Sequence, residues 1–462
     1  MSPSTEKVVI SPSDYFNETH LKNYFIQHLI KKSGGGRDGL TPKKYWEKYQ
    51  EEVPMLCRKC LDGTYRFSYY NEKLLLKGSN KKPRVLSIPT VRDRIVLGVL
   101  NEYLSKVYSD RVSRDVPNKL IKDISEYISS HSEDTITFLR TDFHDFYGTI
   151  YIKMLRNMLS SRISDENIIT LILNAITTPT VSGSVNKEIR RTKKQGIPQG
   201  LSISNILASI YMMSFDKEYG EPSAGLYVRY VDDILFLDVK KTSKHQMLSE
   251  IRRRNLRLRL SAEKCRSGII GKDSLDFIGY AIKDKIFVRQ VNVTRFLNRV
   301  ASLATKCKEG LLDSGKRQQF ILEDSRYYDY YKEELNELLS GFNYGNHLYG
   351  WMPYYQGITD VSALYGMDRV IRNNILKGVP SEITSEVHAL VDIYYDIRRN
   401  GGKNLVQDYD ALDTIGKKES FLARKGKLDT TKNYTDEQIG SIFYNYISRL
   451  IRKTDHDIGE RS

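Results

Sequence analysis

The sequence predicts an α+β fold in which helices back a sheet, followed by a largely helical C-terminal part. Between about residues 80 and 290, strand-like segments alternate with segments of helical spacing, and two strand-like runs flank Asp232-Asp233 as a hairpin. From Val293 the apolar residues follow helical spacing, and residues 325–355 are dense in aromatic rings. At 462 residues the chain is too long for one ordinary core, so roughly two to four domains are expected.

Charge and ring content favour a nucleic-acid partner. The chain has 72 Lys and Arg against 57 Asp and Glu, a net charge of +15, together with 32 Tyr. Cations neutralise phosphates, and flat rings stack on bases. No apolar run approaches the roughly 20 residues of a membrane-spanning helix, and the N-terminus MSPSTEKVVI has no signal-peptide core. We therefore expect a cytoplasmic protein without a membrane partner.

The four cysteines are too few to crosslink a chain of this length. Cys57 and Cys60 have CxxC spacing, but no second Cys or His pair follows at the distance of a zinc site. We expect all four to be reduced, structural thiols.

In the first quarter of the chain, local patterns predict helices around a glycine-rich loop and a basic strand. A helix is expected over about residues 15–30, and Thr41 followed by Pro42 has the form of a helix N-cap and first helical position. Between them lies the glycine-rich loop SGGGRDGLTP. Around residues 77–94, several basic side chains surround a short strand at 85–88 and suit either a triphosphate or a solvated sheet edge.

Further along, a predicted strand ends at an acidic residue and a predicted helix begins after a polar loop. Residues 134–143 alternate as in a strand, with Arg140 and Asp142 on one face. Residues 195–213 open as a loop punctuated by Gly and Pro and then follow helical spacing. We expect this loop to expose Gln199 above the packed helix.

The last third of the chain is predicted to be mostly helical. LDFIGY at 275–280 has the composition of further strands or strand ends. Residues 398–427 are rich in Gly and Lys and predict a linker or mobile loop. A final helix is expected over 435–452, with a capping box between Thr435 and Gln438.

The acidic pair in the hairpin allows two interpretations. Neighbouring carboxylates at a tight turn repel each other, so a fold tolerates them where the turn is solvated or where cations neutralise them. Asp142 is likewise an ordinary loop residue unless the fold brings it beside Asp232. The residues alone leave both interpretations open.

Several motifs, in the correct linear order over residues 35–355, resemble those of reverse transcriptases. YVDD at 230–233 resembles the YxDD box, and Asp142 within RTDFHDFYGTI resembles the first catalytic aspartate box. QGIPQG at 195–200, followed by Ser204 and LA, resembles the PQG box between them. SGGGRDGLTP and KKPRVLSIPTVRDR are similar to the N-terminal and fingers boxes of group II intron-like and retron-like bacterial enzymes, LDFIGY to the primer grip, and GWMPYY to the thumb.

The resemblance implies a two-metal site for phosphoryl transfer. Joining nucleotides is an in-line displacement, in which two Mg²⁺ ions about 3.5–4 Å apart stabilise the attacking 3′ oxygen and the leaving pyrophosphate. By resemblance, Asp142 and Asp232 are the bridging ligands and Asp233 supports the site electrostatically or ligates intermittently. Phe143 is assigned to the same metal-binding set, and Mn²⁺ is an expected substitute for Mg²⁺.

The resemblance also assigns substrate-binding residues. It places the ring of Tyr147 against the sugar of the incoming nucleotide, where a 2′-OH would clash, so dNTPs are selected over NTPs; the alternative is that Tyr147 packs under the sheet. Gln199 is expected to contact template or dNTP, and Lys264 to protonate pyrophosphate. The residues expected at the triphosphate are Lys82 and Arg84, and those expected at nucleic acid are Arg92, Arg94, Trp351, Tyr354 and Tyr355.

The implied architecture is a right-hand polymerase with fingers, palm, a helical thumb and a C-terminal helical extension. We expect an N-terminal helical extension at 1–45, fingers and palm at 46–290, the thumb at 291–400 and a helical tail at 401–462.

The implied activity is RNA-directed DNA synthesis from dNTPs, with a cDNA product. The PQG box lacks the Ser-Pro pair common in intron-encoded enzymes and is similar to that of abortive-infection and other defence-associated reverse transcriptases. No RNase H, protease or HNH segment is recognisable after the thumb. We therefore expect a dedicated, structured non-coding RNA as template and a role in anti-phage defence, with a homo-oligomer left open.

Three alternatives stay open on the sequence alone. The first is a group II intron or retron reverse transcriptase. The second is template-independent synthesis, or synthesis primed by a Tyr hydroxyl of the protein, which the many Tyr residues permit. The third is a catalytically silent RNA-binding scaffold on a polymerase fold.

Overall fold

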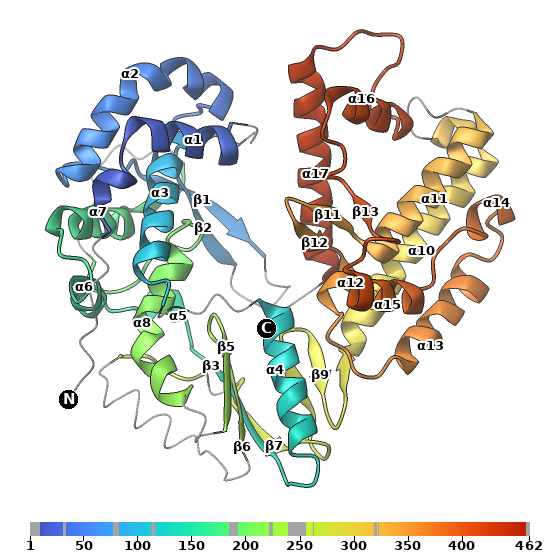
Figure 1. The fold of residues 1–462 in the computed structure, drawn as a ribbon, viewed down its shortest axis with the longest axis horizontal. Helices are drawn as coiled ribbons and strands as arrows, with labels where there is room; N and C mark the ends of the chain where they lie inside the picture. Colours follow the sequence, from blue (N-terminus) through green and yellow to red (C-terminus); the bar gives the residue numbers. More distant parts are fainter. Residues whose placement is uncertain are drawn as a thin grey trace. The chain divides into compact units, whose positions relative to one another are not determined.

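The chain forms two compact units (Figure 1). A computed structural model describes residues 10–30, 34–76, 83–110, 112, 116–183, 193–220, 225–238, 256–261, 263–317, 321 and 323–458. Unit 1 comprises Met1–Arg114 and Leu139–Arg266, and unit 2 comprises Asp115–Phe138 and Ser267–Ser462. Within the described ranges, no helix combines the length and the apolar character needed to cross a bilayer.

Unit 1 combines helices with two sheets. Its helices are α1 (Glu18–His28), α2 (Pro42–Leu61), α3 (Val91–Val107), α5 (Phe146–Thr149), α6 (Ile152–Ser160), α7 (Glu166–Thr177) and α8 (Ser204–Tyr219), with a 3₁₀ turn at Pro12–Asp14. Its strands are β1 (Tyr70–Leu75), β2 (Arg84–Ile88), β4 (Thr180–Val181), β5 (Leu226–Tyr230) and β6 (Asp233–Asp238). Two further strands, β3 (Thr137–Asp142) and β7 (Arg266–Ile269), run across the unit boundaries.

Several predictions for the N-terminal part are confirmed. Helix α2 begins at Pro42, and the Thr41 hydroxyl accepts a hydrogen bond from the N–H of Lys44, which satisfies a donor of the first turn. The predicted basic strand is β2, which pairs antiparallel with β1. The cysteines are free, and burial raises the pKa of Cys57 to about 11, as expected of a structural thiol.

The larger sheet carries the predicted acidic hairpin. Strands β5, β6 and β3 are neighbours in this order, and β5 pairs antiparallel with β6. Tyr230 lies opposite Asp233, so Val231 and Asp232 form a two-residue turn, which confirms the hairpin. Strand β3 ends at Asp142, and the N–H of the next residue, Phe143, donates to the Asp232 carbonyl at 3.3 Å. The sheet thereby joins the end of β3 to the hairpin turn.

Unit 2 is mainly helical. Its helices are α4 (Pro117–Ser130), α10 (Gln290–Leu312), α11 (Asp324–Ser340), α12 (Trp351–Tyr354), α13 (Ser362–Val370), α14 (Ser381–Thr384), α15 (Leu390–Asn400), α16 (Ile415–Arg424) and α17 (Asp436–Ile458), with a 3₁₀ turn at Ser314–Lys316 and a π turn at Ile371–Ile375. Its strands form two small sheets, β8 (Leu275–Phe277), β9 (Tyr280–Ile282) and β10 (Ile286–Val288) in one, and β11 (Phe342–Tyr344), β12 (His347–Tyr349) and β13 (Gln407–Asp408) in the other. The segment LDFIGY comprises β8, a turn and the first residue of β9, which agrees with the expected strands or strand ends.

The division into two units differs from the four expected ranges. Phe25 of α1 stacks on Tyr49 of α2 and both are buried, so α1 and α2 share one core within unit 1. At the other end, Phe421 of α16 and Phe443 of α17 share a hydrophobic cluster with Phe342 of β11. The C-terminal residues are therefore part of the same compact body as the expected thumb.

The segment expected to be a linker is folded. Residues 398–427 contain β13 and α16, and Tyr409, Phe421 and Leu422 are almost fully buried. Burial of these apolar side chains offsets the conformational entropy lost when a Gly- and Lys-rich stretch is ordered. The linker prediction was therefore wrong. The final helix is as predicted at its start, where Thr435 and Gln438 form a reciprocal capping box, but it extends to Ile458.

Candidate active site

The hairpin turn holds Asp232 in a strained but braced backbone. Val231 has a φ of 59°, a left-handed conformation that costs a β-branched residue roughly 1–3 kcal/mol. The guanidinium of Arg229 donates to the Val231 carbonyl at 2.8 Å. Arg229 is itself held by both carboxylate oxygens of Asp216 on α8. This partly buried ion pair fixes the turn that carries Asp232.

Asp142 and Asp232 form the acidic centre of unit 1. Asp142 is only 5% exposed, and Asp232 is half-buried in the turn. Burial raises the pKa of Asp232, the charge of Asp142 raises it further, and the charges of Lys264 and Arg84 oppose the increase. The two carboxylates are therefore close enough to repel each other, and a cation bound between them would relieve that repulsion.

In the described structure, one carboxylate oxygen of Asp142 accepts a hydrogen bond and the other does not. Lys264 donates from Nζ to Oδ2, whereas Oδ1 is buried and has no hydrogen-bond partner among the residues that the structure describes. A buried carboxylate oxygen without a partner carries a desolvation cost of roughly 1–3 kcal/mol or more. Hard cations such as Mg²⁺ prefer carboxylate oxygens, so the residues present fit a divalent cation at this position.

Asp233 is engaged differently. It is 2% exposed, and Arg140 donates to it from Nε at 3.2 Å and from Nη2 at 3.0 Å. Burial raises the pKa of Asp233 to about 6, although the charge of Arg140 lowers it. Both carboxylate oxygens of Asp233 thus face a guanidinium, whereas Oδ1 of Asp142 faces none.

The carboxylates alone do not complete a metal site. Across the described ranges, no three His, Cys, Asp or Glu side chains are grouped closely enough to hold a metal ion. Mg²⁺ is commonly bound by one or two carboxylates, with substrate phosphates and water as the remaining ligands. An Asp142–Asp232 pair matches that pattern, with Phe143 adjacent to Asp142 in sequence and bonded to Asp232 through its N–H.

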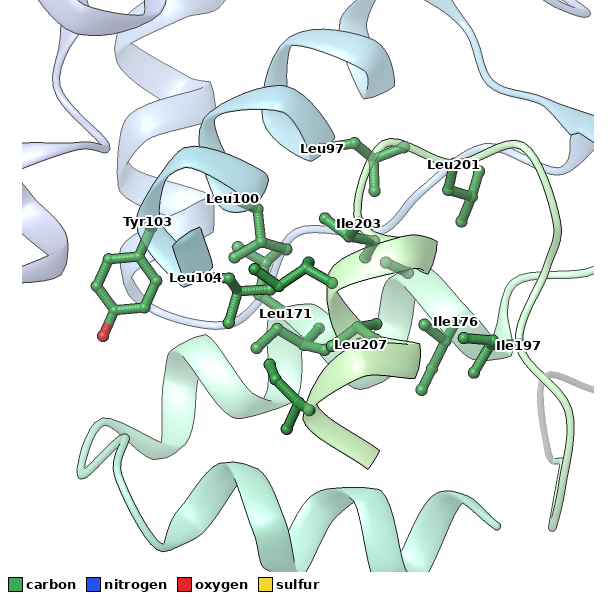
Figure 2. Close-up of a cluster of buried hydrophobic side chains, with 14 of the residues drawn as sticks. Leu97, Leu100, Tyr103, Leu104, Leu171, Ile176, Ile197, Leu201, Ile203 and Leu207 are labelled. Atoms are coloured by element: carbon green, nitrogen blue, oxygen red, sulfur yellow. The ribbon is translucent and has the colours of Figure 1, made fainter. Parts of the chain in front are cut away.

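The loop that carries Gln199 and precedes α8, hereafter the glutamine loop, is anchored by three hydrogen bonds. The N–H of Ile197 donates to the Tyr147 carbonyl at 2.9 Å, and the Gln199 carbonyl accepts from the N–H of Ser87 on β2 at 2.7 Å. Ser204 donates from Oγ to the Pro198 carbonyl at 2.6 Å. Figure 2 shows the apolar side of this anchor, where Ile197, Leu201, Ile203 and Leu207 pack with side chains of α3 and α7.

The structure brings most of the expected substrate-binding residues to this loop. Tyr147 donates from its hydroxyl to Oδ1 of Asn205 at 2.6 Å, and burial together with the charge of Asp232 raises the Tyr147 pKa to about 12. The charge of Arg84, an exposed residue, acts on both Tyr147 and Asp232, so Arg84 lies within electrostatic range of the acidic centre. Gln199 is half-exposed on the loop. Lys82 lies outside the described residues.

The two arginines expected at nucleic acid have structural contacts. Arg94 donates to the carbonyls of Gly34, Gly35 and Pro89 at 2.6, 3.2 and 3.0 Å, so it holds the glycine-rich loop against the start of α3. Arg92 lies over the ring of Tyr65, 5.8 Å from its centroid, and donates to Ser68 Oγ at 3.3 Å. Their nucleic-acid contacts stay predictions.

The three rings expected to stack on bases are in the core of unit 2. Trp351, Tyr354 and Tyr355 are 1%, 9% and 0% exposed. Trp351 stacks on Phe296 at 4.3 Å, and the hydroxyls of Tyr354 and Tyr355 donate to main-chain carbonyls. A buried ring has no free face for a base, so the assignment of these residues to base stacking is corrected to core packing.

Two supporting residues were missed at the sequence level. Arg140 pairs with Asp233, and Arg229 braces the turn at Val231. A usable signal was present, because Arg140 precedes Asp142 by two residues on a strand and therefore lies on its face. Which carboxylate it would contact depended on the pairing of strands distant in sequence.

A sheet with one carboxylate at a strand end and a second in an adjacent hairpin turn is the arrangement of a metal-dependent nucleotidyltransferase. Residues 75–282 match the family model for "Reverse transcriptase (RNA-dependent DNA polymerase)". The chain therefore contains a reverse transcriptase domain, and it includes the hairpin, the end of β3 and the glutamine loop.

Known proteins resemble parts of the chain. Over 192 residues it is 25% identical to Protein YkfC of Escherichia coli (strain K12), covering 39% of this chain and 49% of that protein. Over 201 residues it is 24% identical to the group II intron-encoded protein LtrA of Lactococcus lactis subsp. cremoris, covering 42% of this chain and 33% of LtrA. The match thus spans half or less of each of these relatives.

Two solved telomerases are among the structural matches. That of Candida albicans, in complex with a TWJ fragment of telomeric RNA, matches with a TM-score of 0.42 and 14% identity, over 89% of this chain and 69% of the other. The structure of apo telomerase from Candida tropicalis, truncated from its C-terminal domain, matches with a TM-score of 0.35 and 16% identity. The match covers 48% of this chain and 55% of that chain.

Proposed function

We propose that this protein is an RNA-directed DNA polymerase that extends a 3′ end with dNTPs by two-metal phosphoryl transfer. The observation that carries the proposal is the pair Asp142 and Asp232, which lies within the reverse transcriptase domain and leaves Asp142 Oδ1 buried without a partner. Asp142 and Asp232 would hold Mg²⁺, with Phe143 in the same set and Mn²⁺ as a substitute. The bound ions supply charge stabilisation at the attacking and leaving oxygens.

The side chains around this pair have separate roles in the proposed reaction. Arg84 lies within electrostatic range of the acidic centre and would bind the triphosphate, because a guanidinium presents paired donors to phosphate oxygens. Lys264 keeps a proton at Nζ beside Asp142 Oδ2, where it can be passed to the departing pyrophosphate. Arg140 holds Asp233 away from direct ligation, so Asp233 acts on the site through its charge.

The direct test is primer extension on a defined RNA template. We expect dNTP incorporation that requires a divalent cation, stops at the template end and gives a product complementary to the RNA. Extension independent of template sequence would instead support template-independent synthesis, and DNA that resists separation from the protein after denaturation would support protein priming. Absence of incorporation on every template would favour the silent scaffold.

The ring of Tyr147 is proposed to exclude ribonucleotides. Its hydroxyl is bonded to Asn205, so the ring is held in one place beside the glutamine loop. In Tyr147→Val the space for a 2′-OH opens, and we expect the preference for dNTP over NTP to fall by about tenfold to a hundredfold, measured as the ratio of kcat/KM values.

Tyr147→Phe is the matched control for this prediction, because it removes the hydroxyl and keeps the ring. Its preference for dNTPs should remain near that of the wild type. Unchanged discrimination in Tyr147→Val would show that the ring only packs against the loop.

We further propose a dedicated, structured non-coding RNA as template, with anti-phage defence in the cytoplasm as the setting. The composition of the PQG box supports this, whereas the similarity to LtrA favours the alternative of a group II intron or retron enzyme. Sequencing the RNA and cDNA that copurify with the protein separates these alternatives. A single abundant RNA other than an intron or retron RNA, and loss of phage protection in Asp142→Asn, are the expected results.

A further inference from the structure

Unit 2 contains a cavity of about 590 Å³ lined mainly by α10, α11 and α17. The basic side chains that line it are Arg299, Lys306, Lys427, Arg449 and Lys453. The carboxylates that line it are Glu334 and Glu337. All of these residues lie beyond residue 282, outside the reverse transcriptase domain, so the proposed polymerase reaction does not account for the cavity.

The acidic side of the cavity is neutralised from within the fold. Lys425 is 1% exposed, and its Nζ lies 3.0 Å from Glu334 Oε1 and 3.8 Å from Glu337 Oε2. Tyr409 and Tyr446 also donate to Glu337. Burial raises the pKa of Glu337, and the charge of Lys425 opposes the increase. The five basic side chains that line the cavity therefore outnumber its two carboxylates, both of which already face Lys425.

Three of these cations lack an acidic partner. Within the part of the chain that the structure describes, the ion pairs of this region involve Lys425 and Lys432, and none involves Lys427, Arg449 or Lys453. Burial lowers the pKa of Lys427, and the charges of Lys453, Lys425 and Arg449 lower it further against the opposing charge of Glu334. Like charges held together in this way are stabilised by a bound anion.

Trp351 forms part of the wall of the cavity. The residue is 1% exposed, so its indole lies just behind the surface that a ligand in the cavity would touch.

The spacing of the cations indicates more than one anionic group. Arg299 and Lys306 are seven residues apart on α10, which is about 10 Å at 1.5 Å per residue. Arg449 and Lys453 are four residues apart on one face of α17, which contacts α10. A ligand with successive phosphates matches two such rows better than a single small anion does.

We propose that this cavity binds the successive phosphates of a nucleotide polyphosphate or of a single-stranded nucleic acid. Arg449 and Lys453 provide the charge at the α17 side, and the half-buried Lys427 adds a third cation. The site is separate from the acidic pair in unit 1 and does not depend on polymerase activity.

Trp351 itself reports on occupancy. The chain has two tryptophans, so Trp46→Phe leaves Trp351 as the single source of indole fluorescence. Titration of this variant with inorganic triphosphate, dATP and a 12-nucleotide single-stranded RNA should give a saturable change in emission with at least one of them. Saturation with triphosphate or dATP identifies a free nucleotide as the source of the phosphates, and saturation with RNA alone identifies a strand.

Arg449→Gln and Arg452→Gln, both made in the Trp46→Phe background, form a matched pair on α17. Arg449 lines the cavity, whereas Arg452, three residues away, does not. We expect Arg449→Gln to raise the Kd by on the order of tenfold and to lower its salt dependence, and Arg452→Gln to leave both near the Trp46→Phe values. No emission change with any of the three probes, or equal weakening by both substitutions, would overturn the proposal.

Discussion

Asp142→Asn is expected to lower dNTP incorporation on an RNA template by on the order of 10³-fold or more, because the substitution removes the charge of a proposed metal ligand that is worth several kcal/mol in the transition state. Asn has nearly the same shape as Asp, and residue 142 is the last residue of β3, so the fold should be retained. Single-turnover incorporation at saturating Mg²⁺ measures the effect, and thermal unfolding checks the fold. Asp232→Asn should behave in the same way.

Asp284→Asn is the control for this loss. Asp284 is exposed in the turn between β9 and β10 of unit 2, and its replacement removes the same charge without touching the acidic pair. Its activity should stay within about twofold of the wild type, as is usual for a surface substitution. Substantial incorporation by Asp142→Asn in folded protein would remove this residue from the proposed metal site.

Arg140→Met is expected to destabilise unit 1 by about 3–5 kcal/mol, because it leaves the carboxylate of Asp233 buried without its bidentate partner. Burial already raises the pKa of Asp233 to about 6 in the presence of Arg140. Without the guanidinium, the carboxylate must be protonated or hydrated on folding. The shift in urea midpoint, monitored by a probe in unit 1, measures the cost.

The double variant Arg140→Met/Asp233→Leu distinguishes a lost ion pair from lost packing. Removing both charges leaves no buried ion, so most of the stability lost in Arg140→Met should return. A double variant less stable than Arg140→Met would indicate that the Arg140 side chain acts mainly through its packing. Only stability is compared here, since Asp233 belongs to the proposed catalytic set.

Local patterns predicted the acidic hairpin better than they predicted the surrounding architecture. The hairpin at Asp232 follows from local strand composition and a two-residue turn, both of which are visible in a short window. The Arg140–Asp233 pair depends on β3 lying beside β6, a contact between residues 93 positions apart. Local patterns contain no information on such a pairing until the sheet order is known.

The errors in unit 2 have a similar physical origin. The abundance of Gly and Lys in 398–427 reflects only local polarity. The segment is ordered because Tyr409 and Phe421 pack against α17, which lies further along the sequence. The ring-dense stretch allowed either stacking on bases or core packing. Burial of Trp351, Tyr354 and Tyr355 decides for the core, and burial is a property of tertiary structure.

The interleaved course of the chain has a consequence for the order of folding during synthesis. Helix α4 belongs to unit 2, where Asn118 donates to the Pro353 carbonyl and Gly357 closely approaches Ile121. The whole second segment of unit 1, Leu139–Arg266, is translated after α4 and before these partners. Because ribosomes add residues at about 5–20 per second, unit 1 can fold first, and the apolar face of α4 stays exposed to solvent until the rest of unit 2 is translated. A fragment that starts at residue 267 would lack this helix, so unit 2 should be expressed separately only with residues 115–138 supplied.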